Sequence, residues 1–137
     1  MANTYSLDLE LSSSQYAKIT DAAQTGLDVT GSMTIEFWMK LEQLPSTAGV
    51  VMVLVTKALA TGNQFSYQCF LEVSDNKLYM DWSDDGSNAG AHYTRFHMDL
   101  AFDSSDVGVW RHIAISCTTA TPTVAFYKDA VSKSGTA

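Results

Sequence analysis

The sequence predicts an all-β domain of the sandwich or barrel type, and three observations support this prediction. Apolar residues recur with period two far more often than with the 3.6-residue period of a helix. Strand-like runs follow one another at intervals of about ten residues, as sandwiches and barrels require. The length of 137 residues fits one domain, residues 1–137, with one hydrophobic core.

Eight segments have the pattern of a strand. At residues 7–11, three leucines alternate with Asp8 and Glu10, and we interpret the two acidic side chains as a solvated outer face. The clearest segment is 33–41, where the odd-numbered side chains are apolar and the even-numbered ones mostly polar. A continuous apolar run at 50–55 has the length of a buried strand. The predicted strands are residues 7–11, 33–41, 50–55, 65–73, 77–82, 93–100, 109–117 and 123–128.

The second half of the chain also predicts how some strands are arranged. The segments 77–82 and 93–100 are expected to form a hairpin across the turn-rich residues 83–90. The run 109–117 has apolar side chains on both faces and is expected to be covered on both sides. Short helical turns are expected only at 21–26 or 58–62, and residues 132–137 are interpreted as a small polar tail.

The charge balance excludes two classes of partner. Eight Lys and Arg against fifteen Asp and Glu give a net charge of −7, which opposes phosphate backbones and anionic lipid. No apolar stretch approaches the length of a bilayer, so we expect no nucleic acid and no membrane insertion. The N-terminus has neither a basic start nor a continuous apolar segment, so the sequence predicts no signal peptide in this chain.

Four segments resemble the laminin G-like, concanavalin A-like jelly-roll family. SLDLELSSSQYAKI resembles its opening strand, and LDVTGSMTIEFWMKL resembles the lead into its TIE-x-W strand. VGVWRHIAIS resembles its W-x-H-aliphatic-Ala strand, and VAFYKDAV resembles its Tyr-x-Asp-Gly turn. The resemblance implies a two-layer antiparallel β-sandwich of jelly-roll type, a fold that hosts lectins, adhesion modules, scaffolds and glycoside hydrolases.

Two departures from the family pattern bear on the structure. Ala130 stands where the family usually has the turn glycine, which would accept a left-handed backbone freely. The family continues through further strands after this turn, whereas this chain ends at Ala137, so the jelly roll is expected to lack its C-terminal strands. We expect either that another chain, such as a second copy in a homo-oligomer, pairs with the open sheet edge, or that the sandwich closes in a shortened form.

No pattern in the sequence predicts catalysis. The Glu-x-Asp-x-Glu run of the hydrolase relatives is absent, as are a GxSxG elbow and a Gly-rich phosphate loop. His92, His97 and His112 lack zinc-binding spacing, and His112 matches a structural position of the family. Cys69 and Cys117 have no CxxC partner and are expected to be buried thiols rather than a disulfide. We therefore expect no catalytic residue, no metal site and no enzyme activity.

The loop at residues 81–90 is the favoured place for recognition. Asp84, Asp85 and Asn88 concentrate oxygen ligands there, a composition that suits calcium. The same residues are common in ordinary hairpin loops because they bond to their own backbone. We favour the turn and expect no cofactor, with calcium as the alternative.

Beside this loop the sequence predicts a polar face rich in aromatic side chains. A pyranose stacks its apolar face on an aromatic ring and bonds its hydroxyl groups to Asp, Asn or Arg, although such residues also form the ordinary outside of a sandwich. Trp38 and Trp110 are expected to pack in the core or between strands rather than to bind a ligand. The candidate carbohydrate-binding residues are Tyr79, Asp81, Asp84, Asp85, Asn88, Tyr93, Arg95 and His97.

The sequence thus predicts a non-catalytic recognition or adhesion module whose favoured partner is a glycan or another cell-surface ligand. The first alternative is a structural or assembly protein, for example a phage virion component, whose open sheet edge pairs with another chain. The second alternative is a glycoside hydrolase. By analogy of fold, an extracellular or virion-associated location is expected.

Overall fold

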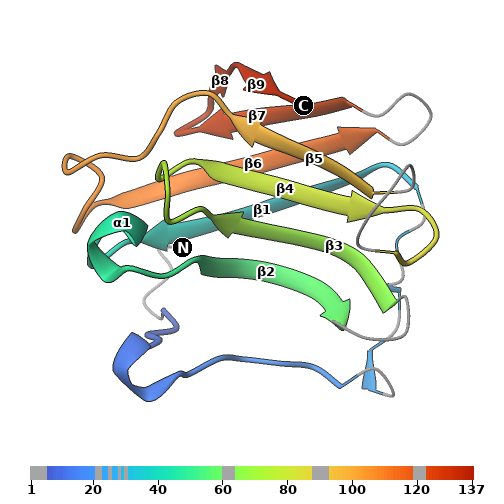
Figure 1. Cartoon of the computed structure of the whole chain (residues 1–137), viewed down its shortest axis with the longest axis horizontal. Coiled ribbons are helices and arrows are strands. Elements are labelled where there is room, and N and C mark those ends of the chain that lie inside the picture. The colour runs from blue at the N-terminus through green and yellow to red at the C-terminus, as the bar shows by residue number, and fades with distance from the viewer. Residues whose placement is uncertain are drawn as a thin grey trace, which may run out of the picture.

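The fold is a two-layer antiparallel β-sandwich, as predicted (Figure 1). The computed structural model describes residues 6–20, 23–24, 26–27, 29, 31–59, 64–87, 93–118 and 123–137. One layer has the strand order β1–β6–β7–β8 and the other has the order β2–β3–β4–β5–β9. The strands are β1 (Met33–Lys40), β2 (Met52–Leu59), β3 (Gln64–Leu71), β4 (Leu78–Ser83), β5 (Tyr93–Met98), β6 (Trp110–Thr118), β7 (Thr123–Lys128), β8 (Val131–Lys133) and β9 (Gly135–Thr136). The 3-10 helix η1 (Leu11–Ser13) and the one-turn helix α1 (Pro45–Ala48) complete the described elements.

The hydrophobic core lies between the two layers. Every odd-numbered side chain of β1 is buried or partly buried and every even-numbered one is exposed, so the predicted polarity of this strand is confirmed. In the middle of each sheet the burial is complete, as Ile113 and Phe126 show in one layer and Leu78 in the other. Only alternate residues of β6 are fully buried, so the expectation that 109–117 is covered on both sides is wrong. A two-layer sandwich covers each sheet on one face.

Both cysteines are buried free thiols, as predicted. Cys69 lies in β3 and Cys117 in β6, on the facing inner sides of the two sheets. Burial raises the pKa of the Cys117 thiol to about 11 and raises that of Cys69 further, because a thiolate in apolar surroundings loses its hydration. Both side chains therefore act as small apolar core residues.

The segment at residues 7–11 does not form the predicted strand. Residues 6–10 are irregular, and Ser13 N–H and Gln15 N–H both donate to the carbonyl oxygen of Glu10, which makes a local turn instead. Leu7 and Leu9 are exposed. Period-two alternation gives a segment an apolar face, but a strand also needs a neighbouring strand to pair with. None of the described strands pairs with residues 7–11. The helical turn expected at 58–62 is wrong where it is described, because residues 58 and 59 belong to β2. In the alternative segment 21–26, residues 21, 22 and 25 lie outside the described residues, but Ala23 is 3-10 helical, and Ala23 N–H and Gln24 N–H both donate to the carbonyl oxygen of Thr20.

The polar tail expected at residues 132–137 is wrong as well, because this segment closes one side of the sandwich. After the β7–β8 turn, β8 pairs with β7 in one sheet, and the chain then crosses over so that β9 pairs with β5 in the other (upper part of Figure 1). Asp129 and Ala130 form this turn with φ values of 54° and 61°. Ala130 therefore does occupy the left-handed position that a glycine would favour.

The opposite side of the sandwich is open in the described part of the chain. β1 pairs only with β6, and β2 pairs only with β3, so each sheet ends in a strand with one neighbour. In Figure 1 the segment 6–20 runs past this side without joining either sheet. The structure thus closes one side with its own C-terminal strands and leaves two strand edges unpaired on the other.

Candidate functional site

The β4–β5 hairpin brings five of the predicted binding residues onto one surface. Tyr79 lies opposite His97, Asp81 opposite Arg95, and Ser83 opposite Tyr93. The alternate residues of β4 point into the core, so these side chains lie on the outer face of the five-stranded sheet. The hairpin predicted from the sequence is confirmed, and we call this surface the β4–β5 face.

A buried carboxylate holds the centre of the β4–β5 face together. Asp81 is only 2% exposed. The Tyr93 hydroxyl donates to Asp81 Oδ2 over 2.5 Å, and Arg95 donates from Nε to Oδ1 over 2.8 Å and from Nη2 to Oδ2 over 2.7 Å. Arg95 Nη2 also donates to the Tyr93 hydroxyl oxygen over 2.8 Å. Both carboxylate oxygens are therefore occupied, and the charge of Asp81 is compensated by a two-point ion pair.

These contacts fix the charge states of the outer groups. Burial and the hydrogen bond to Asp81 raise the pKa of the Tyr93 phenol to about 12, so it stays neutral at physiological pH. The hydrogen bond to Asp81 raises the pKa of the Arg95 guanidinium, which keeps its charge. Asp81 has little surface to offer a ligand itself. By accepting hydrogen bonds from Tyr93 and Arg95, Asp81 instead acts as a positioning residue that fixes where these two side chains lie.

Aromatic rings surround the guanidinium group of Arg95. Phe70 and Tyr79 are stacked with ring centroids 5.3 Å apart, and Tyr79 and His97 are stacked with centroids 5.2 Å apart. The Arg95 guanidinium carbon lies 5.4 Å from the Phe70 centroid, 5.6 Å from Tyr79 and 5.7 Å from Tyr93. The β4–β5 face thus presents a half-exposed guanidinium group that lies over the buried Phe70 ring and the partly exposed tyrosine rings.

The loop that follows β4 is held by its own side chains. Ser87 N–H donates to Asp85 Oδ1 over 2.8 Å, and Gly86 N–H donates to Ser83 Oγ over 3.0 Å. These are the backbone contacts expected of Asp and Ser in a hairpin turn. Asp84 and Asp85 are exposed beside the end of β4, and Asn88 lies outside the described residues.

The two tryptophans that were expected to be packed are exposed instead. Trp38 is 64% exposed and Trp110 is 47% exposed. Both lie on the outer face of the four-stranded sheet, because Trp38 is an even-numbered residue of β1 and Trp110 is paired with the neighbouring even-numbered Lys40. The alternation in residues 33–41 had already placed Trp38 on the polar side of the strand. This parity was the signal that an indole side chain faces solvent.

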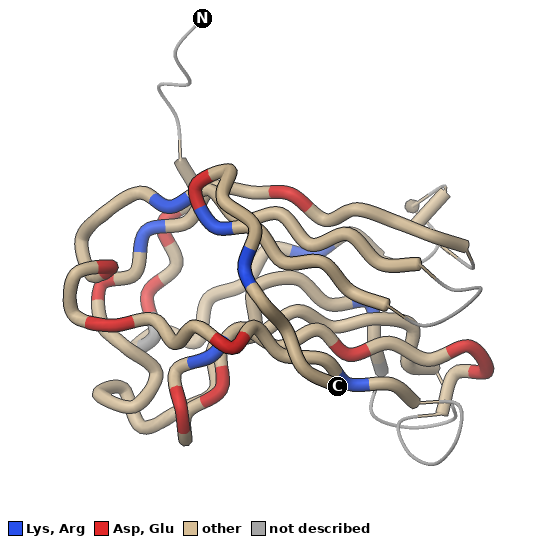
Figure 2. Tube along the Cα trace, turned by 90° about the horizontal axis from the view of Figure 1, so that it is seen from above, with Lys and Arg blue, Asp and Glu red and all other residues tan. Residues whose placement is uncertain are grey.

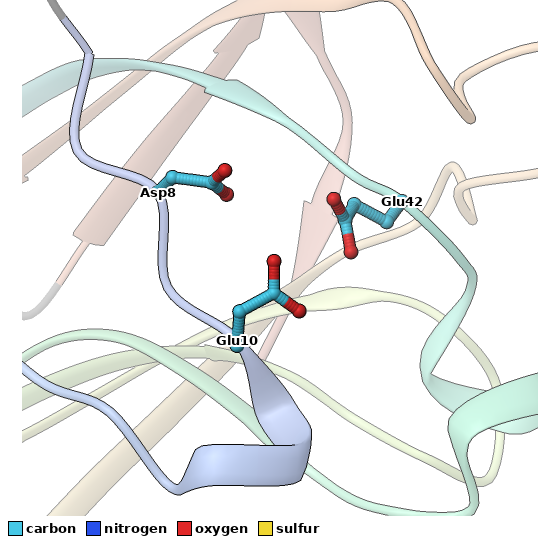
Figure 3. Close-up of side chains that lie close together, drawn as sticks. All are labelled: Asp8, Glu10 and Glu42. Atoms are coloured by element: carbon cyan, nitrogen blue, oxygen red, sulfur yellow. The ribbon is translucent and has the colours of Figure 1, made fainter.

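Three exposed carboxylates meet near the open side of the sandwich (Figure 3). Asp8, Glu10 and Glu42 each place a carboxylate oxygen within 4.8 Å of the other two. The sequence predicted that Asp8 and Glu10 are solvated but not that Glu42 joins them, because Glu42 comes from the segment after β1. Exposed acidic groups of this kind are common without a metal ion, and we assign no ion to it.

Charged residues are concentrated at the end of the sandwich where β6 begins and β7 ends (Figure 2, left). Asp106 is 1% exposed there, and its Oδ1 lies 2.8 Å from Arg111 Nε and 2.6 Å from Lys128 Nζ. Arg111 Nη1 also donates to Asp129 Oδ2 over 3.0 Å. These ion pairs connect the loop before β6 to the first residues of β6 and to the last residue of β7, which indicates a structural role.

His112 and Glu36 form a further pair on the outer face of the four-stranded sheet. The sequence placed His112 at a structural position of the family, and its Nε2 atom lies 2.9 Å from Oε1 of Glu36. Within the described part of the chain, none of the helices has the length and apolar character needed to span a bilayer.

Comparison with known proteins identifies the family of the chain. Residues 11–137 match a laminin G-type family model described as the concanavalin A-like lectin/glucanases superfamily. Searches of the curated proteins and of the solved structures found no match. Since the family match covers most of the chain and the structure is the two-layer sandwich that this match implies, the chain belongs to the concanavalin A-like lectin/glucanase superfamily.

Proposed function

We propose that this protein is a non-catalytic recognition module that binds carbohydrate on the β4–β5 face. The observation that carries the proposal is the assembly of Tyr79, Tyr93, Arg95 and His97 around the buried Asp81. Membership of a superfamily of lectins and glucanases is compatible with this function. A glycan on a cell surface is the favoured ligand.

The chemistry of the face suits a sugar. The Tyr79 and His97 rings are partly exposed and offer aromatic area at little conformational cost, and a pyranose has an apolar face that stacks on such a ring. The Arg95 guanidinium group and the Tyr93 hydroxyl offer polar contacts to sugar hydroxyls at the edge of these rings. Asp81 holds both groups in place before a ligand arrives, and such preorganisation reduces the entropy lost on binding. Asp84, Asp85 and Asn88 belong to the loop that follows β4 and are proposed as additional sugar contacts.

The same arrangement favours binding over hydrolysis. Glycoside hydrolases generally need one carboxyl group that donates a proton and a second that attacks or activates water. Asp81 is the carboxylate at the centre of the face, and both its oxygens are engaged by Tyr93 and Arg95. Release of reducing sugar from laminarin or agarose that disappears in Asp81→Asn or Asp85→Asn would instead support the hydrolase alternative.

A glycan array followed by calorimetry on any ligand found tests the proposal. We expect Tyr93→Ala and Asp85→Ala to weaken binding by about tenfold or more, since each removes polar contacts worth about 1–3 kcal/mol in a dry site. The matched control is Tyr16→Ala, which removes an exposed tyrosine that lies in the N-terminal segment. Equal affinity of all three variants for the glycan would contradict the proposed site, and absence of any glycan ligand would contradict the proposed function.

The second candidate function is assembly with another chain. The observation that favours it is the open side of the sandwich, where β1 and β2 each have one neighbour among the described strands and Val53 is half-exposed. Unpaired strand edges are templates for pairing with another sheet. A second copy is the expected partner, and an extracellular or virion-associated location fits either function. Sedimentation velocity of the wild type and of Val53→Lys tests this: an oligomer that the lysine disrupts supports assembly, and a monomeric wild type contradicts it.

A further inference from the structure

We propose that the outer face of the four-stranded sheet carries a second carbohydrate site, built on Trp38 and Trp110, that binds a neutral oligosaccharide of at least two sugar units. We call this surface the Trp platform and define it by Glu36, Trp38, Lys40, Trp110 and His112. It belongs to the sheet opposite the β4–β5 face. The proposal rests on the proposed function only in taking carbohydrate as the class of ligand.

The register of β1 and β6 determines the shape of the Trp platform. Trp38 lies directly opposite His112, and Lys40 lies directly opposite Trp110, so the two tryptophans are diagonal neighbours on one face. Diagonal neighbours on antiparallel strands have side chains about 7–8 Å apart. The two indole side chains therefore project from the same face of the sheet as diagonal neighbours, close enough for one chain of sugars to reach both.

Polar groups flank the two indole rings and leave about half or more of each side chain accessible. The His112 ring contacts Trp38 with centroids 5.2 Å apart, and its Nε2 lies 2.9 Å from Glu36 Oε1. Lys40 Nζ lies 5.9 Å from the centroid of the Trp110 ring. With exposed fractions of 64% and 47%, both indoles remain open to solvent. Contact between an apolar indole ring and water is unfavourable, so a ligand that covers the exposed rings gains free energy by removing that contact.

The composition of the Trp platform favours a sugar chain over a protein partner. A stable protein interface buries about 800 Å² on each side around an apolar centre depleted of charge. Here two rings are interleaved with the carboxylate of Glu36, the ammonium group of Lys40 and the imidazole of His112. Rings that stack on apolar sugar faces, with hydrogen-bonding groups at their edges, match the alternating apolar and hydroxyl surfaces of a glycan.

The length and charge of the ligand follow from the same surface. A flat sheet face does not enclose a small molecule, so a single sugar would contact one ring while a chain would contact both. The net charge of −7 repels polyanions, which argues against acidic polysaccharides. The ligand class is therefore a neutral oligosaccharide whose affinity rises with chain length until both rings are covered.

Calorimetry with neutral oligosaccharides of one to six units from laminarin, mannan, xylan and dextran tests this inference. We expect an affinity that rises steeply between one and three units. We expect Trp38→Ala and Trp110→Ala each to weaken binding of the longer chains by at least tenfold, because large aromatic side chains dominate such contacts. Trp38→Phe should keep most of the affinity. Buried Trp82 is left unchanged, so its fluorescence reports that each variant is folded.

The controls separate this inference from the proposed function. Tyr93→Ala alters the β4–β5 face and leaves the Trp platform intact. Glycan binding that Tyr93→Ala abolishes and both tryptophan variants leave unchanged would overturn the second site while supporting the first. Failure of every neutral oligosaccharide to bind would overturn the second site. An oligomer of the wild type that Trp38→Ala converts to monomer, without any glycan binding, would show a protein interface and also overturn it.

Discussion

Replacing Gly135 by alanine tests whether β9 closes the sandwich as the structure indicates. A Cβ atom at Gly135 would lie 2.7 Å from Cδ2 and 2.8 Å from Cε2 of the Phe126 ring, and 3.1 Å from the carbonyl oxygen of His97. Two of these contacts are shorter than any a real Cβ makes, so something must move. Phe126 is fully buried in the core and has no free space to rotate into.

The cost follows from this geometry. Overpacking of a well-packed core costs about 1–3 kcal/mol of unfolding free energy. For a domain of this size, 1 kcal/mol corresponds to about 3–5 °C in the melting temperature, so a decrease of about 3–15 °C is expected. β9 pairs with β5 through only two residue pairs, so moving β9 is the easiest relaxation. Hydrogen exchange at residues 134–136 should therefore accelerate more than exchange in the core strands.

The matched control is Gly31→Ala. Nothing lies within 4 Å of a Cβ at Gly31, and its backbone is not left-handed, so its stability should change by less than about 0.5 kcal/mol. Combining Gly135→Ala with Phe126→Leu, which has no Cε2 atom, should cost about 1 kcal/mol less than the sum of the single changes. Urea unfolding measures all four variants. If Gly135→Ala is as stable as Gly31→Ala, then β9 does not pack on Phe126 as described.

Three further predictions follow from individual sites. Ala130→Gly should raise the unfolding free energy by about 1 kcal/mol in urea titrations, because φ is 61° there; an unchanged or lower stability would contradict the left-handed turn. Cys69 and Cys117 should not react with a thiol reagent at pH 8 in the native protein and should both react in denaturant; fast native labelling would contradict their burial. Tyr93 should titrate near pH 12 in alkaline absorbance measurements. Because its folded pKa lies above the ordinary value of about 10, its stabilising effect is complete below pH 10 and is lost as the pH rises toward 12. Asp81→Asn should lower this pKa, and an unchanged value would contradict the hydrogen bond to Asp81.

Local sequence patterns determined much of the fold and part of the candidate site. The alternation in residues 33–41 specified which side chains of β1 face the core, and two alternating runs around a polar loop specified the β4–β5 hairpin. Side-chain direction in a strand has a fixed period of two, so these assignments need only neighbouring residues. The same rule placed Tyr79, Tyr93, Arg95 and His97 on one surface before any contact was known.

Which surfaces are covered was decided only by the tertiary structure. Residues 7–11 alternate as well as β1 does, yet they remain outside both sheets, while the polar residues after Ala130 pair with β7 and β5. Asp81 is buried and Trp38 is exposed, which is the reverse of what each side chain alone favours. A strand is buried or exposed according to the neighbours that the whole chain brings to it, and those neighbours are separated from it by many residues. Alternation therefore tells which way a side chain points, and only the assembled sheets determine what it meets there.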